Sequence, residues 1–380
     1  MGLQKVVGPV RARQDPSLSP RLAPEIQVSH FRSGYAGNSD RPGESMSVHI
    51  SLTAAEVPPS AEFVDFLENW VSGKPFDGTT WSEFGRERVN ADRRADVLER
   101  IERIIDDPEG ERQVARAYEL YVALLIGDVA TLRAVHERFR FVPVVGIPRS
   151  GGKYLVKQLL RNHGHDPATV PEALGHDGFP HAEPWRFGWT RTLRAMAEYL
   201  TMVEIFFGGD RTATVPKKAT KAVYASALFR TALGVPAEGV ITVRHPVPAC
   251  VSTYETAGGP PAGGRFAVRG NIERSCASEL MSLGFSRAEL QRLDYFDAYL
   301  RYWENYHVRL AMESAAIAGA FRIAPFGTTP YPSAEEFHLR EERVPRSDWM
   351  ERAEPALRRV AEQWERVGLE FPSAEIGAAR

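Results

Sequence analysis

The 380-residue sequence lacks the features that mark several large classes of protein. Its only cysteines, Cys250 and Cys276, are too few for a disulfide framework, which predicts a reducing compartment and a cytoplasmic protein. No run approaches the roughly 18 uncharged apolar residues that a membrane span needs. Residues 1–10 also lack the apolar core of a signal peptide.

Neither sign of charge is in surplus. The 47 Lys and Arg residues face 49 Asp and Glu residues, and the formal net charge is −2. A near-neutral chain gives no support for binding along nucleic acid or on an anionic membrane, although a local basic pocket stays compatible with it. Hydrophobic residues make up 43% of the chain, which is enough to bury a large core.

The chain divides into three predicted regions. Residues 1–59 hold seven of the 27 prolines and no sustained apolar period, which predicts a disordered or loosely attached arm. Residues 60–138 are predicted to form a helical layer behind Ser60, a predicted N-cap. Its apolar stripes contain Phe63, Phe66, Leu67, Trp70 and Val71, then Val97, Leu98, Ile101, Ile104 and Ile105, and then Val114, Tyr118, Tyr121, Val122, Leu125, Leu132 and Val135.

Residues 139–380 are predicted to form an α/β domain with a central parallel sheet flanked by helices. Short apolar runs at 141–147 and 239–243 are typical of strands buried on both faces, and a further short strand is expected at 212–216. Helical stretches follow each of them. Because strands alternate with helices, the sheet should be parallel, and ligands should bind at the carboxyl ends of its strands.

The first candidate site follows the strand at 141–147. The turn Pro148-Arg149-Ser150-Gly151-Gly152 and the helix after it would aim backbone N–H groups at an anion, with Lys153 nearby. Gly146 and Gly151 have P-loop spacing, but Gly152 stands where the P-loop Lys belongs. The lysine that follows, Lys153, precedes Tyr154 and not the Ser or Thr that would bind Mg²⁺, which disfavours a Mg²⁺-dependent kinase. A turn that needs glycine only for its geometry is the alternative.

The second candidate site follows the strand at 239–243. Arg244 ends that strand, and Ser252 lies eight residues later in the next predicted helix, with Pro246 between them. An arginine fork and a hydroxyl that converge on one point suit a terminal phosphate monoester.

Together the two turns resemble the sulfotransferases that use 3′-phosphoadenosine 5′-phosphosulfate (PAPS). The first resembles the family's P-[KR]-S-G-T loop, and the second resembles its R-x-P-x-x-x-x-x-S motif. The resemblance covers residues 141–254 and implies a P-loop-like sulfotransferase fold. It implies that the 5′ end of the cofactor binds to Arg149, Ser150, Gly151, Gly152 and Lys153, and that its 3′-phosphate binds to Arg244 and Ser252.

The chain departs from this family at three places. Gly152 replaces the usual Thr of the loop, and Lys153 replaces a second hydroxyl residue. The late basic cofactor segment of cytosolic eukaryotic members has no clear copy, and Arg265 is the candidate substitute. These exchanges keep open a catalytically impaired nucleotide-binding module.

Lysines and a histidine-rich segment supply candidates for the chemistry. Lys218, in the run Lys217-Lys218-Ala219-Thr220-Lys221, resembles the family lysine that contacts the bridging oxygen or the sulfuryl group, and a solvated basic turn is the alternative. His181 and Glu183 are the candidate bases, because family bases are His or Glu and this segment lies on the acceptor side. The other histidines of the segment, His163, His165 and His176, match no metal-binding signature, so no metal is expected.

An aromatic-rich helix is predicted after the capping box at residues 286–289. Its aromatic residues are Tyr295, Phe296, Tyr299, Trp303 and Tyr306. A stripe at this spacing favours core packing over the wall of an acceptor pocket.

The sequence therefore predicts transfer of a sulfuryl group from PAPS to a hydroxyl or amine of a small or medium-sized acceptor. Lys218 and Lys153 would stabilise the transferred group. A small-molecule kinase of the P-loop class is the alternative enzyme. The sequence predicts neither the acceptor nor the oligomeric state.

Overall fold

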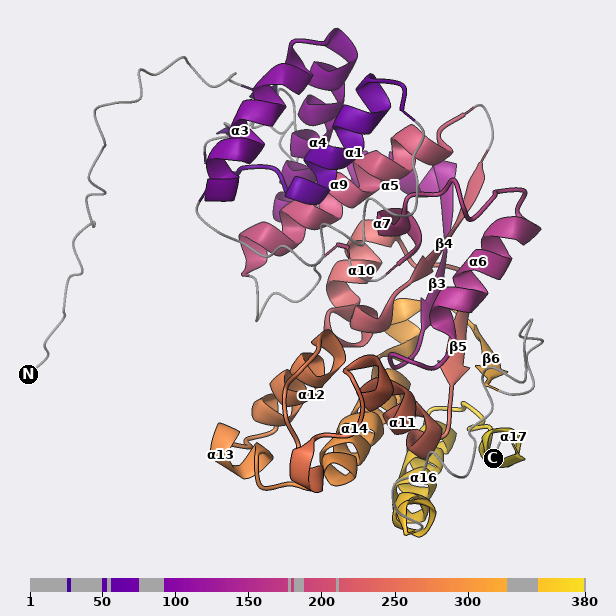
Figure 1. Ribbon diagram of the computed structural model, residues 1–380. Helices are drawn as coiled ribbons and strands as arrows, with labels where there is room; N and C mark the ends of the chain where they lie inside the picture. Colours follow the sequence, from indigo (N-terminus) through magenta and orange to yellow (C-terminus); the bar gives the residue numbers. More distant parts are fainter. Residues whose placement is uncertain are drawn as a thin grey trace, which may run out of the picture.

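The computed structural model of the chain is an α/β structure with a central sheet of four parallel strands (Figure 1). The residues described are 26–28, 50–52, 56–74, 92–176, 179–180, 188–209, 212–326 and 348–378. The predicted α/β class with a parallel sheet is confirmed. Among the described helices, none combines the length and the apolar character that crossing a bilayer requires.

The strands of the central sheet lie in the order β4–β3–β5–β6. Their bounds are Phe139–Val145 for β3, Ala213–Lys218 for β4, Gly239–Val243 for β5 and Phe321–Pro325 for β6. All five residues of β5 are buried, as expected for a parallel strand covered on both faces. β6 was not predicted from the sequence, and it pairs with β5 from Gly239 opposite Phe321 to Val243 opposite Pro325.

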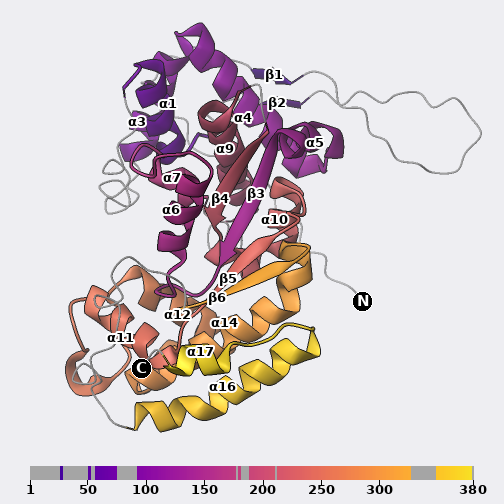
Figure 2. The same cartoon turned by 90° about the vertical axis from the view of Figure 1, so that its right-hand side faces the viewer.

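Helices cover both faces of this sheet. α6 (Gly152–Asn162) and α7 (Glu172–Gly175) lie on one side of β3, and α10 (Ser226–Leu233) lies on the other (Figures 1 and 2). η1 (Thr220–Tyr224) and α10 pack against the long helix α14 (Tyr295–Ile317). The carboxyl ends of the strands point toward α11 (Pro246–Thr256) and α12 (Asn271–Ser282).

The predicted helices of residues 60–138 are present and form a layer with α9. The bounds are Ala61–Val71 for α1, Asp92–Ile105 for α3, Pro108–Ile126 for α4, Val129–Arg138 for α5 and Trp189–Phe207 for α9. Ser60 is the N-cap of α1, as predicted, because its Oγ accepts a hydrogen bond from the Phe63 N–H at 3.2 Å. α4 packs along α9, where Met196, Leu200 and Val203 are buried.

A buried carboxylate joins α1 to α9. Glu198 of α9 accepts hydrogen bonds from the backbone N–H of Ser60 at 2.8 Å and from its hydroxyl at 2.5 Å. Burial raises the pKa of Glu198, while the charge of Arg194 and the bonds from Ser60 oppose that rise. The start of α1 is thus tied to a residue 138 positions later.

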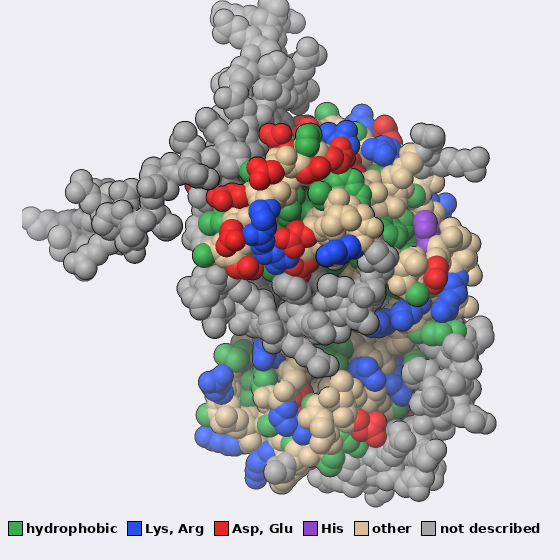
Figure 3. All heavy atoms as spheres, turned by 45° about the horizontal axis from the view of Figure 1, so that its top comes forward, with side chains coloured by type: hydrophobic (Ala, Val, Ile, Leu, Met, Phe, Trp, Pro, Cys, Tyr) green, Lys and Arg blue, Asp and Glu red, His purple; other side chains and the backbone are tan. Residues whose placement is uncertain are grey.

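Ion pairs cross the surface of the N-terminal helices, where acidic and basic side chains are interspersed (Figure 3). Arg100 of α3 bonds both Asp65 and Glu68 of α1, and its contact with Glu68 Oε2 is 2.6 Å. Arg116 of α4 bonds Glu204 of α9 through two nitrogens, at 2.8 and 2.9 Å. These ion pairs connect α1 to α3 and α4 to α9.

Two short strands lie within the predicted N-terminal arm. β1 (Ile26–Val28) pairs antiparallel with β2 (Ile50–Leu52), and β1 contacts α4. The prediction for residues 1–59 contained no strand. Apart from β1 and β2, the residues before position 56 lie outside the described part of the chain.

The C-terminal part surrounds the aromatic helix α14. Its further elements are η2 (Ala262–Gly264), α13 (Arg287–Leu290), α16 (Trp349–Arg366) and α17 (Ser373–Ala378). The five aromatic residues predicted for the core, from Tyr295 to Tyr306, are buried, which confirms their packing role. The predicted helix start was wrong, because the capping box at Ser286 opens only the short helix α13, and Asp294 caps α14.

Candidate functional site

The two candidate turns meet at the switch point of the sheet. After β3 the chain first forms β4 on one side of β3 and then crosses to form β5 on the other side. The carboxyl ends of β3 and β5 are therefore adjacent, while their connections lead to opposite sides of the sheet. In open α/β sheets this crevice is the usual place for a ligand. The turn 146–151 follows β3, and the turn 244–245 follows β5.

The turn after β3 is packed against β5. A Cβ added to Gly146 would lie 2.0 Å from Thr242 Oγ1 and 2.6 Å from the Thr242 carbonyl oxygen, so no side chain fits there. Ser150 is 1% exposed, and its hydroxyl bonds the Ile147 carbonyl at 2.6 Å and the Thr242 hydroxyl at 2.7 Å. The predicted ligand Ser150 thus uses its side chain to hold the turn against β5.

The turn leaves the first N–H groups of α6 without a side-chain cap. Gly151 precedes the helix at a φ of +91°, in the left-handed region that favours glycine, and it provides no capping side chain. The first N–H groups of a helix have no partner within the helix and attract anions. The sequence prediction of an anion cradle at Gly151, Gly152 and Lys153 therefore has a matching backbone geometry.

Gly152 makes room for Lys218. A Cβ at position 152 would lie 3.3 Å from Cε of Lys218 and 3.6 Å from its Cγ and Cδ. Lys218 is 9% exposed, and its aliphatic chain passes over the first residue of α6. Because position 152 has no side chain, Lys218 can approach the start of α6 closely.

Arg149 links the two turns. Its Nε donates to Ser252 Oγ at 2.8 Å, and its carbonyl oxygen accepts a hydrogen bond from Nη1 of Arg244 at 3.1 Å. The φ of Arg149 is +72°, in the left-handed region, where the backbone of any residue other than glycine is strained. Residues with such strained backbones are often found at functional sites. The structure thus brings Arg149 together with Arg244 and Ser252, which lie 95 and 103 residues later in the sequence.

Arg244 is held by the elements around the end of β5. It is 8% exposed, and its guanidinium lies 4.2 Å from the centre of the Phe326 ring, which follows β6. Its carbonyl oxygen accepts a hydrogen bond from Trp303 Nε1 of α14 at 3.1 Å. Stacking on an aromatic ring limits the orientations of a guanidinium, so Arg244 is preorganised to bind an anion.

The start of α11 is built differently from the start of α6. Pro246 and Pro248, in its first turn, have no N–H group, and the N–H of Val247 donates to Nδ1 of His245 at 3.2 Å. The backbone at the start of α11 therefore has few free N–H groups that could bind an anion. An anion after β5 must therefore bind to the side chains of Arg244 and Ser252.

The two lysines at the end of β4 have different surroundings. The alternative of a solvated basic turn is wrong, because Lys217 is 1% exposed and both lysines belong to the strand. The Lys217 ammonium donates to the carbonyl oxygens of Ala173 at 2.9 Å, Phe179 at 2.5 Å and His176, and it lies 4.5 Å from the centre of the Tyr199 ring. Lys217 thus attaches the segment after α7 to the sheet, and Lys218 remains the candidate for chemistry.

Lys153 is paired with a carboxylate. Its Nζ lies 2.5 Å from Oε1 of Glu172, the first residue of α7. The Lys153 side chain is 53% exposed, whereas that of Glu172 is 18% exposed. Lys153 therefore has an anionic partner within the protein.

The remaining predicted site residues are not brought into this cluster by any contact that the structure describes. Arg265 is exposed, and its Nη1 donates to the Arg292 carbonyl at 2.7 Å in the segment between α13 and α14. His181 and Glu183, the candidate bases, lie outside the described residues.

Among the residues that are described, no group of three or more His, Cys, Asp or Glu side chains could hold a metal ion. His165 packs edge-on against Phe207, with 5.0 Å between the ring centres, and partial burial lowers its pKa. The backbone of His176 serves Lys217. The His165 ring thus packs against α9, and the His176 carbonyl oxygen helps to hold Lys217.

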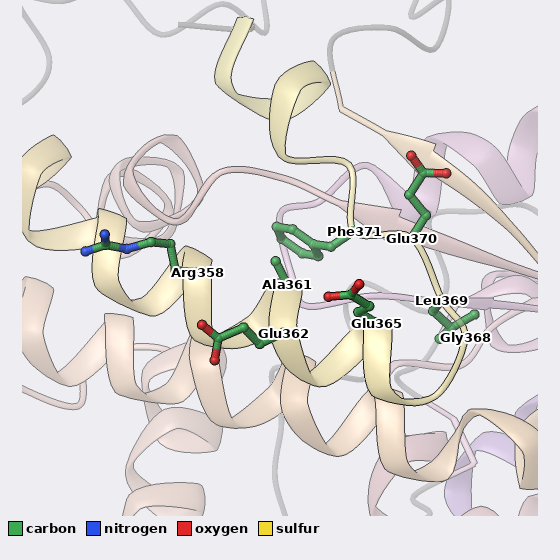
Figure 4. A pocket seen from close by; sticks show the side chains of 8 residues that line it. All are labelled: Arg358, Ala361, Glu362, Glu365, Gly368, Leu369, Glu370 and Phe371. Atoms are coloured by element: carbon green, nitrogen blue, oxygen red, sulfur yellow. The ribbon is translucent and has the colours of Figure 1, made fainter.

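An open hollow lies beside α16, on the C-terminal part of the chain (Figure 4). Arg358, Ala361, Glu362 and Glu365 of α16 line it, together with the segment 368–371. In Figure 4 the Phe371 ring faces α16 across this hollow. None of the predicted site residues lines it, so it is separate from the two turns.

Sequence analysis missed the residues that brace the turns. Thr242 contacts Ser150, and Thr220 Oγ1 donates to the Gly146 carbonyl at 3.0 Å. Thr242 is the single hydroxyl residue in the otherwise apolar strand Gly239–Val243, and that exception was a usable signal. Trp303 and Phe326 gave no local signal, because only the fold brings them to Arg244.

No protein-family model matches the chain, and no curated protein or solved structure is significantly similar to it.

Proposed function

We propose that the chain is a PAPS-dependent sulfotransferase with a P-loop-like sulfotransferase fold. The observation that carries the proposal is the cluster of Arg149, Arg244 and Ser252 at the switch point of the sheet. Two guanidinium groups and a hydroxyl from separate turns, beside an uncapped helix start, suit a ligand with two anionic ends.

The proposed cofactor would bind with one end at each turn. The N–H groups at the start of α6, with Arg149 and Lys153, would bind the 5′-phosphosulfate. Arg244 and Ser252 would bind the 3′-phosphate, because the start of α11 has little backbone to offer. The bond between Arg149 and Ser252 joins residues assigned to opposite ends, so we expect nucleotide binding to break it.

The proposed reaction is an in-line transfer. The acceptor oxygen or nitrogen attacks the sulfur, the bond from sulfur to the bridging phosphate oxygen breaks, and 3′-phosphoadenosine 5′-phosphate leaves. The acceptor proton passes to a base, for which His181 and Glu183 remain the candidates. Lys218, which lies over the start of α6, would stabilise the charge that develops on the bridging oxygen.

The segment before the candidate bases is held in place by Lys217. Its three hydrogen bonds attach Ala173, His176 and Phe179 to the end of β4, next to Lys218. The proposed acceptor is a small or medium-sized molecule of the cytoplasm, and nothing in the charge of the chain favours nucleic acid as a partner.

Calorimetry with 3′-phosphoadenosine 5′-phosphate tests the proposal. We expect the wild type to bind this product, and Arg244→Ala to lose about 2–3 kcal/mol of binding free energy, or about 30- to 150-fold in Kd, because a charge-assisted contact disappears. Adenosine 5′-monophosphate lacks the 3′-phosphate, so its weaker affinity should hardly change. Arg322→Ala, which removes an exposed arginine of β6, is the matched control.

Two results would contradict the proposal. Equal affinity of wild type and Arg244→Ala for the product would remove the 3′-phosphate site. Tighter binding of ATP with Mg²⁺ than of 3′-phosphoadenosine 5′-phosphate would favour the kinase. Binding of PAPS without transfer to any acceptor or to water would instead indicate the catalytically impaired module.

A further inference from the structure

The ion pair between Lys153 and Glu172 lies at the helix end that the proposed function assigns to the 5′ anion. Lys153 is the second residue of α6, so its ammonium and the uncapped N–H groups of the first turn serve the same end of the helix. Glu172 approaches that ammonium to 2.5 Å. A carboxylate of the protein thus forms an ion pair with Lys153, one of the cations of the predicted anion cradle.

The fold holds Glu172 in this position. α7 lies against α6, and a Cβ on Gly175 would come within 3.2 Å of Val156 Cγ1. The buried Lys217 donates hydrogen bonds to the carbonyl oxygen of Ala173, within α7, and to that of Phe179, four residues after α7 ends. The backbone that carries the carboxylate is therefore fastened on two sides, to α6 and to β4.

A ligand anion and the Glu172 carboxylate compete for the same lysine. If the pair stays closed, the carboxylate repels the incoming anion, because like charges at this range oppose each other. If Lys153 turns to the ligand, the pair must open and its contribution is lost. In both cases Glu172 weakens the binding of an anion at the start of α6.

We propose that Glu172 sets the affinity of this site for the anionic 5′ end of the ligand, by acting as an internal competitor for Lys153. This inference rests on the proposed function. It assigns to Glu172 a role in binding and release: the carboxylate takes back the lysine as the product leaves. The effect is specific to ligands that place a charged group at α6.

The test compares four proteins in calorimetry: wild type, Glu172→Gln, Lys153→Met and the double variant. Each is titrated with 3′-phosphoadenosine 5′-phosphate and with adenosine 3′-monophosphate, which lacks the 5′ anion. We expect Glu172→Gln to bind the bisphosphate about two- to fivefold more tightly, the size expected for an exposed ion pair. Adenosine 3′-monophosphate should bind equally to both proteins, and the gain should vanish in the Lys153→Met background.

Glu304→Gln is the matched control, because it breaks the ion pair of Glu304 with Arg359 on α14 and α16 with the same change of net charge. It should leave both affinities at their wild-type values. The inference is overturned if Glu172→Gln binds the bisphosphate no more tightly than the wild type. It is also overturned if the gain persists without Lys153, or if it appears equally for adenosine 3′-monophosphate.

Failure of the proposed function gives a different result. In that case the wild type binds neither nucleotide, and the same four proteins are titrated with inorganic pyrophosphate. Tighter binding of pyrophosphate by Glu172→Gln, dependent on Lys153, would retain the competition at α6 without the nucleotide. Absence of that gain would overturn the competition as well.

Discussion

The two strand-to-helix turns at the switch point differ in the groups that they could offer to an anion. The turn before α6 has two glycines and no capping side chain, so its backbone N–H groups face outward. The first turn of α11 has two prolines, and the preceding His245 caps Val247, so few backbone N–H groups are available there. The first is suited to backbone binding of a group that must be approached closely. The second is suited to binding by side chains.

This difference shows that similar positions in a parallel sheet need not provide similar sites. Both turns follow a buried strand and precede a helix of 11 residues. Helix position alone would predict two backbone anion sites. The placement of proline and glycine within three residues of each helix start decides which of them is available.

The largest expected effect comes from Gly146→Ala, which would force the two turns apart. The new Cβ would lie 2.0 Å from Thr242 Oγ1 and 2.6 Å from a backbone oxygen, neither of which can yield. We expect the free energy of unfolding to fall by about 3 kcal/mol or more, measured by urea denaturation. Gly152→Ala is the control, because its Cβ meets only the flexible chain of Lys218, and it should cost less than about 1 kcal/mol. Wild-type stability of Gly146→Ala would mean that the turn does not pack on β5 in this way.

A smaller effect is expected from His245→Ala, which opens the backbone at the start of α11. Loss of the cap on Val247 should lower the free energy of unfolding by about 1–2 kcal/mol. Asn is a good capping residue, so His245→Asn should retain most of the stability. Affinity for 3′-phosphoadenosine 5′-phosphate should stay close to the wild type in calorimetry, because both prolines remain. A marked gain in affinity for His245→Ala would contradict the distinction between the turns.

The smallest expected effect concerns the strained backbone of Arg149. Glycine adopts a φ of +72° without penalty, so Arg149→Gly should be more stable than Arg149→Ala by about 1 kcal/mol in thermal denaturation. Both variants lose the guanidinium and should lose the same affinity for 3′-phosphoadenosine 5′-phosphate. If the alanine variant is the more stable of the two, the left-handed conformation is not present in solution.

The helices and strands whose own residues form a clear apolar pattern could be predicted from the sequence. The apolar runs that became β3 and β5 and the helical stripes behind Ser60 are present where the sequence indicated. β6 was missed because it is an edge strand with one buried residue among five, so its apolar pattern is weak. β1 and β2 were missed because three-residue strands depend on a partner that lies more than 20 positions away.

The residues of the candidate site could be predicted from local motifs, but the long-range contacts that hold them in place could not. Local motifs pointed to Arg149, Arg244 and Ser252, and the structure brings these residues together. The bracing role of Ser150 depends on Thr242, 92 residues away, and that of Lys217 depends on carbonyl oxygens about 40 residues away. Such roles follow from the order and register of the strands, which local sequence does not show.

The packing of α4 along α9 has a consequence for where the part of the chain that contains the two candidate turns can be separated from the rest. The buried face of α9, with Met196, Leu200 and Val203, belongs to the same hydrophobic core as α1 and α4. A polypeptide begun at Phe139 would keep both candidate turns but would expose this face to water. The Glu198 carboxylate would also lose its hydrogen bonds from Ser60. We therefore expect the smallest part of the chain that folds to be larger than the part that contains the two turns.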